Sequence, residues 1–331
     1  MQIIPVQELR EGDTLAKGLY APDGRLMLKQ GIALNESLIE GIKRRGHRYV
    51  TVEMEGSRSS AAFEIKRNLM HVSKDVLSLV FHSLREHTAF PRRALAEWTD
   101  IVATTVTEAP ELTFDCRDMV IGDDELVSHS LNVCFLALLA AKALGYSKKK
   151  LKEIAIGSLL HDVGLALPHD DRLMLHHPLI GYDYLRKQSG IPAESLRIVL
   201  QHHEQIDGRG FPYGISDGHF LEAAQICGLA SDFDYFMNDR ESDDRPPSEG
   251  IDFVMSKIDS SYGYPVVRAF LHAFQPYPVG TRVTLSGSLR GTVRAVNKAN
   301  PGRPVVELDE SGMKIDLMKH MTFHIVKMIR E

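Results

Sequence analysis

The sequence predicts a mainly α-helical protein, in which a small α+β unit precedes a central helical domain and a short β-rich extension follows it. Three observations predict this architecture. Apolar residues recur at three- and four-residue spacing through residues 61–108 and 120–275, both ends of the chain contain short alternating runs, and polar or Gly/Pro-rich stretches separate the regions. A chain of 331 residues has room for about two domains of roughly 100–200 residues each.

Residues 1–55 predict a small α+β domain. The runs IIPV, TLAKGLYA and RYVTVEM predict strands, and APDG predicts a turn. The stretch NESLIEGIKRRG predicts one short helix, with Asn35 as its N-cap and Gly46 just after its last turn. The polar stretch EGSRSS marks a junction, after which residues 56–119 predict connector helices.

Residues 120–275 predict an all-α domain. DELVSHSLNVCFLALLAAKALG predicts a long helix ending at Gly145, and SKKKLKEIAIGSLLHDVG predicts a second one capped by Ser147. HPLIGYDYLRKQSG, PAESLRIVLQHHE and EAAQICGLASDFDYFMND predict three more, the last after the loop DGRGFPYGISDG. Residues 276–331 predict a β-rich extension, because RVTLS, GTVRAV, RPVVELD and TFHIVKMI are short runs separated by turn signals.

The composition excludes several classes of protein. A net charge of −5 does not indicate a nucleic-acid groove or an anionic membrane partner. The cysteines Cys116, Cys134 and Cys227 are too few and too widely spaced for a disulfide framework or a CxxC zinc module, and they favour a reducing compartment. The N-terminus lacks the pattern of a signal peptide, and the longest apolar run, residues 133–141, is too short to span a bilayer. We therefore expect a cytoplasmic protein with no membrane span.

Histidine is the unusual component of the composition, because seven of the 15 histidines lie between residues 129 and 203. Imidazole and carboxylate groups are the usual ligands of many divalent ions. Glu125 and His129 share one face of a predicted helix, and the His161–Asp162 pair follows an apolar run, where a charge needs a partner or a metal. Further predicted helices carry His177, His202 and His203. Together these residues predict a metal cluster with nitrogen and oxygen ligands.

The segments SHSLNV, GSLLHDVG, HHPLIGYDYL, QHHEQIDGRGFPYG and DFDYFMNDR resemble the HD-GYP subgroup of the HD phosphohydrolases over residues 120–275. The HS, HD and HHE-x-x-DG-x-G-aromatic-P motifs occur in the order of that family, and His129 precedes His161 by the expected 32 residues. LREGDTLAKGLYAPDGRLMLKQG resembles the small N-terminal domain that is often fused to HD-GYP units. The β-rich end resembles the tail of many Gram-positive members. The chain therefore resembles a divergent member.

The resemblance implies an HD-type helical bundle around two divalent metal ions, with a third in some members, and iron or manganese as the usual metals. It also implies a bacterial signalling enzyme that hydrolyses cyclic di-GMP to pGpG or GMP through a metal-activated bridging hydroxide. The physics is coherent, since two close ions polarise a phosphodiester, lower the pKa of a bridging water and orient it for attack. A nucleotide related to cyclic di-GMP is the alternative substrate.

Carried over residue by residue, the resemblance places Asp162 as the bridging carboxylate that acts with His161 in catalysis. The remaining ligands that it implies are His129 and His161 for the first ion, His177, His202 and His203 for the second, and Glu125 for a third. Its implied substrate contacts are Arg209 and Arg240, which could clamp phosphates, and the glycines Gly208 and Gly210, which shape the loop.

The sequence departs from the family pattern in four places. Leu165 stands where the family has a lysine proton donor, and general-acid help is typically worth about 10²–10⁴-fold. Ser231 stands where the family has an aspartate ligand of the first ion. The adjacent Asp232 is a candidate to replace that ligand, although the side chains of neighbouring helix residues point about 100° apart. The segment between residues 162 and 177 is shorter than usual, and Phe211 replaces the tyrosine of GYP.

Three interpretations stay open from the sequence. The first is a metal-dependent phosphodiesterase, which the nearly complete His/Asp set favours. The second is a degenerate HD-GYP module that binds metal or nucleotide and signals through protein partners without efficient hydrolysis, which Leu165 and Ser231 favour. The third is a helical scaffold with incidental histidines. Protein partners that dock on the N-terminal domain, and a homodimer, are both compatible with the first two.

Overall fold

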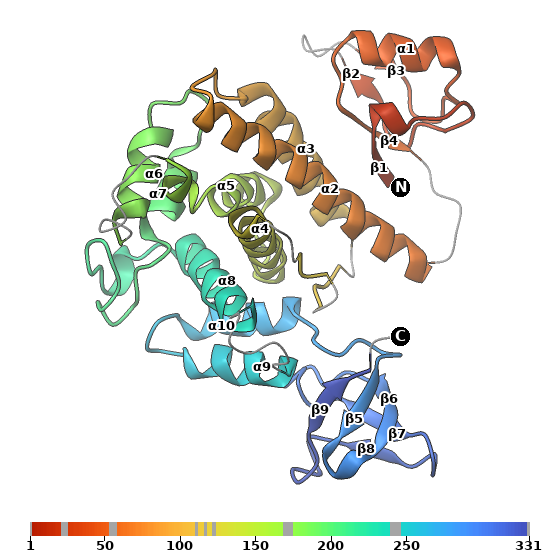
Figure 1. Cartoon of the computed structure of the whole chain (residues 1–331), viewed down its shortest axis with the longest axis vertical. Helices are drawn as coiled ribbons and strands as arrows, with labels where there is room; N and C mark the ends of the chain where they lie inside the picture. Colours follow the sequence, from red (N-terminus) through yellow and green to blue (C-terminus); the bar gives the residue numbers. More distant parts are fainter. Residues whose placement is uncertain are drawn as a thin grey trace. The chain divides into compact units, whose positions relative to one another are not determined.

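The mainly α architecture predicted from the sequence is confirmed by the computed structural model of the chain (Figure 1). The structure describes residues 2–20, 26–52, 58–109, 112–115, 118–120, 124–167, 175–238 and 246–329. These residues belong to two compact units, residues 1–76 and residues 77–331, and each is described by itself.

The first unit is a small α+β domain. Its strands are β1 (Gln2–Pro5), β2 (Leu19–Tyr20), β3 (Leu26–Leu28) and β4 (Tyr49–Val52), and β1 pairs antiparallel with β4, as β2 does with β3. The predicted helix is α1 (Glu36–Arg44), and the Asn35 side chain caps it by accepting a hydrogen bond from the Leu38 amide at 2.9 Å. Gly46 follows with φ 76°, the left-handed conformation that glycine allows at a helix end. The predicted APDG turn lies outside the described residues.

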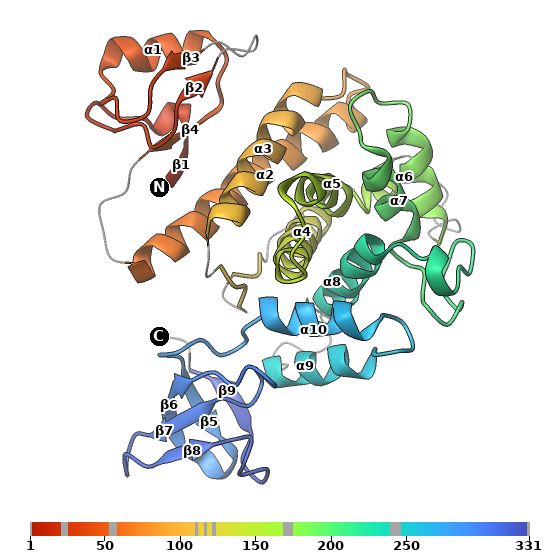
Figure 2. The ribbon, with the colours of Figure 1, turned by 180° about the vertical axis from the view of Figure 1, so that it is seen from behind.

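The predicted connector consists of two helices, α2 (Arg58–Arg85) and α3 (Arg92–Glu108). Helix α2 ends at Arg85, shortly before His87, whose φ of 50° is not helical, and Pro91 is the N-cap residue of α3. The second unit contains α2 from Leu77 onward, and this part lies beside α3 in both views (Figures 1 and 2).

The helical bundle of the second unit is built around two central helices. Its helices are α4 (Glu125–Ala143), α5 (Lys148–Leu159), α6 (His177–Leu185), α7 (Ala193–Gln201), α8 (Glu222–Asn238), α9 (Pro247–Ser256) and α10 (Tyr264–Ala273). Helices α4 and α5 pack on each other between α3 on one side and α8 with α10 on the other (Figures 1 and 2). Asp124 caps α4 and Ser147 caps α5, as side chains that accept a hydrogen bond from an amide three residues on.

Helix α4 is long and apolar enough to cross a membrane by length and composition alone. However, 83% of its apolar window is buried inside the protein, as in the core helix of a bundle. Leu131, Leu136 and Leu138 on this helix are each at most 1% exposed. The long apolar run in the sequence is therefore accounted for by packing against α5, α8 and α10.

The C-terminal extension forms a five-stranded antiparallel sheet in the order β8-β7-β6-β5-β9. Its strands are β5 (Arg282–Leu285), β6 (Arg290–Ala295), β7 (Val305–Leu308), β8 (Lys314–Asp316) and β9 (Ile325–Met328). Alternate residues such as Val283, Val293 and Val306 are fully buried in its core. Four of the strands match runs identified from the sequence, whereas β8 has only three residues, too few to show a period of two.

Candidate metal centre

Asp162 lies at the centre of a buried cluster of imidazoles. It follows α5 and is 1% exposed. Its Oδ2 atom lies 3.5 Å from Nε2 of His129 and 3.4 Å from Nε2 of His161. Its Oδ1 atom lies 3.0 Å from Nε2 of His177 and 3.4 Å from Nε2 of His202. One carboxylate therefore faces its neighbour His161 and three histidines from other segments of the bundle.

The cluster consists of two groups that share this carboxylate. The first group is His129, His161 and Asp162. The second group is Asp162, His177, His202 and His203. Within each group one nitrogen or oxygen atom per residue lies within 4.8 Å of all the others, which is the arrangement that a bound ion requires.

Three of the histidine rings are held by hydrogen bonds on the side away from the cluster. Nδ1 of His161 and of His202 each lies 2.8 Å from the carbonyl oxygen three residues earlier in the chain. Because a carbonyl oxygen only accepts, Nδ1 carries the proton and Nε2 of the neutral ring presents a lone pair to the cluster. Nδ1 of His129 similarly donates to Oδ2 of Asp234 at 2.7 Å. Such outward partners fix the orientation and tautomer of metal-binding histidines.

The donor atoms of the cluster fit divalent metal ions. The Nε2 atoms of His129 and His161 are 3.2 Å apart, and those of His177 and His202 are also 3.2 Å apart. Oδ1 of Asp162 is buried and has no hydrogen-bond partner. Lone pairs facing one another around a buried carboxylate are unfavourable by themselves, and a cation between them satisfies all of them. Imidazole and carboxylate suit iron, manganese, zinc and nickel alike.

The protonation states of the cluster also suit a metal. Burial lowers the pKa of His161 to about 3, and burial likewise lowers the pKa of His203. Burial opposes ionisation of Asp162, but His161 and the other histidines hold its pKa well below the usual range. Burial also opposes protonation of His129, but the carboxylates of Asp234 and Asp162 outweigh it and raise its pKa. Metal binding requires an ionised carboxylate and neutral imidazoles, and this cluster provides both. Among its imidazoles, His129 is the one that holds a proton most readily.

Asp234 contacts His129 on the side of the ring that faces away from the first group. It is 3% exposed, and its Oδ1 atom accepts hydrogen bonds from the side-chain amides of Asn132 and Asn238, both at 2.8 Å. Its Oδ2 atom is left for His129. In the sequence Asp234 matches the second aspartate of the family pattern, but its contact with His129 could not be predicted from the sequence alone.

Replacing Asp234 by Asn is expected to weaken the retention of metal about 10–100-fold, because the loss of a charged partner of a ligating histidine has effects of this size. Chelator competition on the metal-loaded protein measures this. The matched control is Asp252→Asn, an exposed aspartate on α9. An unchanged chelator midpoint for Asp234→Asn would show that His129 needs no charged support.

Asp232 does not replace the aspartate that Ser231 lacks. Its carboxylate accepts a hydrogen bond from Oη of Tyr262 at 2.9 Å and lies 3.8 Å from Nζ of Lys257. Burial raises the pKa of Asp232. The hydroxyl of Ser231 faces the cluster instead, with Oγ 3.2 Å from Nε2 of His129. The turn of about 100° between neighbouring helix residues explains the difference. The interpretation of Asp232 as a ligand is therefore corrected.

The other residues implied by the family lie apart from the two groups or outside the described residues. Glu125 is exposed in the first turn of α4 and belongs to neither group. The Arg209 side chain is 85% exposed and lies 3.6 Å from Asp207. Arg240 lies outside the described residues. Leu165 is half-buried in the short 3-10 turn η2 (Val163–Ala166) that follows Asp162.

The loop after α7 is held close to the second group. A Cβ atom on Gly210 would lie 2.3 Å from Cα of Glu204, so that only glycine permits this approach of the two backbone segments. Gly208 has φ 76°, which glycine adopts without strain. The ring of Phe211 stacks on His203, with centroids 4.4 Å apart and an interplanar angle of 19°. The shape of this loop thus depends on both glycines, and their contact with a substrate stays a prediction.

Glu204 fixes the same loop from inside the protein. It is fully buried, and its two oxygens accept hydrogen bonds from the amides of Tyr213 and Ile215, both at 2.8 Å. Glu204 belongs to the HHE motif of the sequence, but its partners are backbone groups, which a sequence does not show.

Replacing Glu204 by Ala is expected to lower the free energy of unfolding by about 2–4 kcal/mol, because two charge-assisted hydrogen bonds are lost and two amides lose their partners. Urea unfolding of the metal-free protein measures this loss. The control is Glu310→Ala, at an exposed turn of the C-terminal sheet. Equal stability of the two variants would mean that water replaces the carboxylate without cost.

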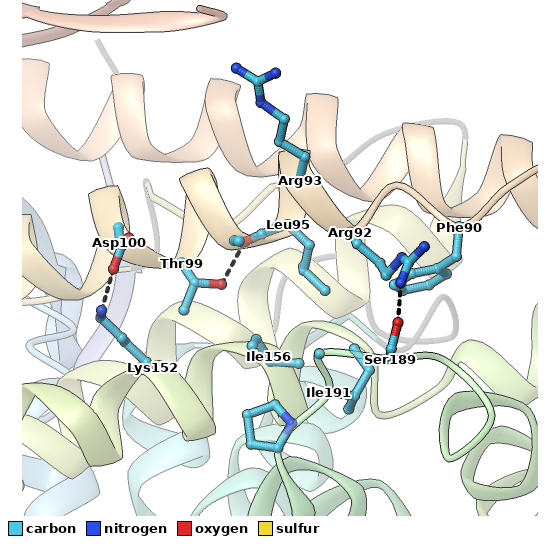
Figure 3. Close-up of a pocket in the computed structure, with 13 residues that line it drawn as sticks. Phe90, Arg92, Arg93, Leu95, Thr99, Asp100, Lys152, Ile156, Ser189 and Ile191 are labelled. Carbon is cyan, nitrogen blue, oxygen red and sulfur yellow. Dashed lines mark hydrogen bonds and ion pairs between the residues drawn. The ribbon is translucent and has the colours of Figure 1, made fainter. Parts of the chain in front are cut away.

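A separate surface pocket of about 580 Å³ lies between α3, α5 and the segment before α7 (Figure 3). Its floor is apolar, with Leu95 and Ile156, and Lys152 at its edge is paired with Asp100. Arg93 is directed away from it (Figure 3). None of the residues implied by the family lines this pocket, so the chemistry of the site is placed at the histidine cluster and not here.

Comparison with known proteins identifies the class. The pattern of the HD domain family matches residues 126–248. A cyclic di-GMP phosphodiesterase of Pseudomonas aeruginosa is 24% identical over 266 residues, which are 73% of this chain and 63% of that protein. A cyclic di-GMP phosphodiesterase of Thermotoga maritima is 28% identical over 181 residues, which are 50% of this chain and 48% of that protein.

The fold is similar to that of a solved structure. A solved structure of an HDG"Y"P protein from Bdellovibrio bacteriovorus superposes with a TM-score of 0.52 at 16% identity, covering 81% of this chain and 97% of that one. Residues 126–248 therefore match an HD domain, and the relatives and the fold are consistent with a divergent HD-GYP family member, in agreement with the resemblance seen in the sequence. The matches span less than two thirds of the length of the two curated relatives.

Proposed function

We propose that this chain is a metal-dependent phosphodiesterase that hydrolyses cyclic di-GMP, or a closely related cyclic dinucleotide, to a linear dinucleotide or to mononucleotides. The observation that carries the proposal is the single carboxylate of Asp162, which faces a group of histidines with each of its two oxygens. The names of the relatives as cyclic di-GMP phosphodiesterases support the substrate class.

The proposed ligands are the members of the two groups, with iron or manganese as the metals. Two ions held in this way would polarise a phosphodiester and lower the pKa of a bound water. The chain's own residues position the ligands. Asp162 is shared by the two groups, and backbone carbonyls fix the rings of His161 and His202. Phe211 and the loop that carries it close the second group on one side. Arg209 and Arg240 stay proposed phosphate contacts.

A second function is favoured by Leu165 and Ser231. An apolar side chain in the turn after Asp162 supplies no proton to a leaving oxygen, and a serine hydroxyl supplies no charge to the first group. In this alternative the domain binds metal and nucleotide but passes the signal to protein partners with little hydrolysis. It differs from the first function in turnover and not in binding.

The test is hydrolysis of cyclic di-GMP by protein loaded with iron or manganese, followed by chromatography of the products. Turnover above that of the His161→Ala/Asp162→Ala variant supports the enzyme, and its absence contradicts it. Equilibrium binding of cyclic di-GMP in the same preparation then identifies the signalling alternative. A gain of turnover in Leu165→Lys/Ser231→Asp would show that those two positions limit the wild-type chain.

A further inference from the structure

Two hydroxyl groups on α8 face the first group. Ser231 and Tyr235 are four residues apart and therefore lie on one face of the helix. Oγ of Ser231 lies 3.2 Å from Nε2 of His129. Oη of Tyr235 donates a hydrogen bond to Oδ2 of Asp162 at 3.4 Å, and its ring lies on that of His129 with centroids 4.1 Å apart.

These contacts place both hydroxyls on the same side of Asp162. Oδ2 is the oxygen that faces His129 and His161, whereas Oδ1 faces the second group. Both hydroxyls therefore border the space enclosed by the donor atoms of the first group. Tyr235 is also 51% exposed, so that its ring lies at the solvent side of this space and not in the core.

Helix α8 carries two carboxylates near the cluster, but neither is directed into it. Asp234 is used by His129 from behind and by two asparagines, and Asp232 is used by Tyr262 and Lys257. The first group thus has two imidazoles and a shared carboxylate, and the second has three imidazoles and the same carboxylate. What α8 adds to the first group is two neutral oxygens.

We propose that the hydroxyls of Ser231 and Tyr235 complete the first group, and that this group consequently holds its ion more weakly than the second group does. The inference rests on the proposed two-ion function of the cluster. Neutral oxygens bind divalent ions less tightly than carboxylates do, and affinity is tuned by the number of charged ligands. The chain therefore keeps one ion firmly and exchanges the other with the surrounding supply of metal, so that the supply regulates activity.

The test uses the full chain loaded with Mn²⁺ and dialysed against a graded series of chelator concentrations, with manganese per chain measured by elemental analysis. The wild type is expected to lose its ions in two steps. In Ser231→Asp the weaker step moves to a chelator concentration about tenfold higher, because a charged ligand is added. In Ser231→Ala and in Tyr235→Phe it moves in the opposite direction. The stronger step stays in place in all three variants.

The matched controls are Ser256→Asp, which adds the same charge at an exposed position of α9, and Tyr264→Phe, which removes a hydroxyl from a tyrosine that is 53% exposed on α10. Both should retain metal as the wild type does. Circular dichroism confirms the folding of each variant, and Ser231→Ala and Tyr235→Phe decide the matter if Ser231→Asp does not fold. Loss of both ions in a single step, or a weaker step that none of the three variants moves, overturns the proposal.

Hydrolysis of cyclic di-GMP is measured separately at saturating Mn²⁺. Two steps without hydrolysis would contradict the proposed function and the regulation of activity by metal supply, and would leave in place the inference that the first group holds its ion more weakly. A single step with hydrolysis would contradict the inference alone. Tyr235→Phe additionally distinguishes the two hydroxyls, since an effect of Ser231→Ala without any effect of Tyr235→Phe limits the ligand role to the serine and overturns the part assigned to the tyrosine.

Discussion

Asp162→Ala is expected to remove retained metal from both groups and to lower hydrolysis at saturating metal by about 10³-fold or more. Both groups use this one carboxylate, so its loss leaves each with imidazoles alone. A metal ion supplies several kcal/mol of transition-state stabilisation, and about 1.4 kcal/mol corresponds to a factor of ten. Metal content by elemental analysis and the rate of nucleotide hydrolysis measure the two effects independently.

Asp162→Asn and Asp183→Asn are the variants that sharpen this test. Asn at residue 162 keeps the shape and one oxygen but removes the charge, and it should lose metal nearly as fully as Ala does. Asp183 lies on α6, where it is exposed and pairs with Arg186, so that its replacement changes one surface charge and should leave metal content unchanged. Retention of both ions by Asp162→Ala would mean that the carboxylate does not join the two groups.

The helices and most of the histidine cluster could be predicted because their signals are local. Asn35 and Ser147 cap helices through contacts within three residues, and the HD and HHE motifs mark the ends of two apolar helices. A glycine ends α4 for the same local reason, with Gly145 at φ 79°. The motifs contain the members of both groups, and the fold brings these residues together around one carboxylate.

The residues that were missed or misplaced depend on contacts between distant segments. A sequence shows that Ser231 and Asp232 are neighbours, but only the rotation of α8 against α4 decides that the serine faces His129. Asp234 is useful because Asn132 and His129 on another helix come to it. Tyr235 lies within the segment DFDYFMNDR, but its partners lie on α4 and after α5, so that the sequence does not indicate its role.

Gly164→Ala is expected to lower the free energy of unfolding by about 3 kcal/mol and to weaken the second group. Gly164 follows the HD motif by two residues, and a Cβ atom on it would lie 2.1 Å from the carbonyl oxygen of His177. This neighbour is backbone, so that it can move only if the start of α6 moves with it. Overpacking of this kind typically costs about 1–3 kcal/mol, and the upper end applies where backbone must shift. Urea unfolding of the metal-free protein measures the loss.

The same variant links packing to the site, because His177 is the first residue of α6 and a member of the second group. A shift of that helix end moves Nε2 away from Asp162, and the firmly held ion should then be lost at a lower chelator concentration. Gly218→Ala is the control, since nothing lies within 4 Å of a Cβ atom there and its stability should change by no more than about 0.5 kcal/mol. Wild-type stability and metal retention in Gly164→Ala would show that α6 is held more loosely than its contact with this glycine indicates. The close approach of Gly164 to the backbone of His177 would then not be what positions His177 in the second group.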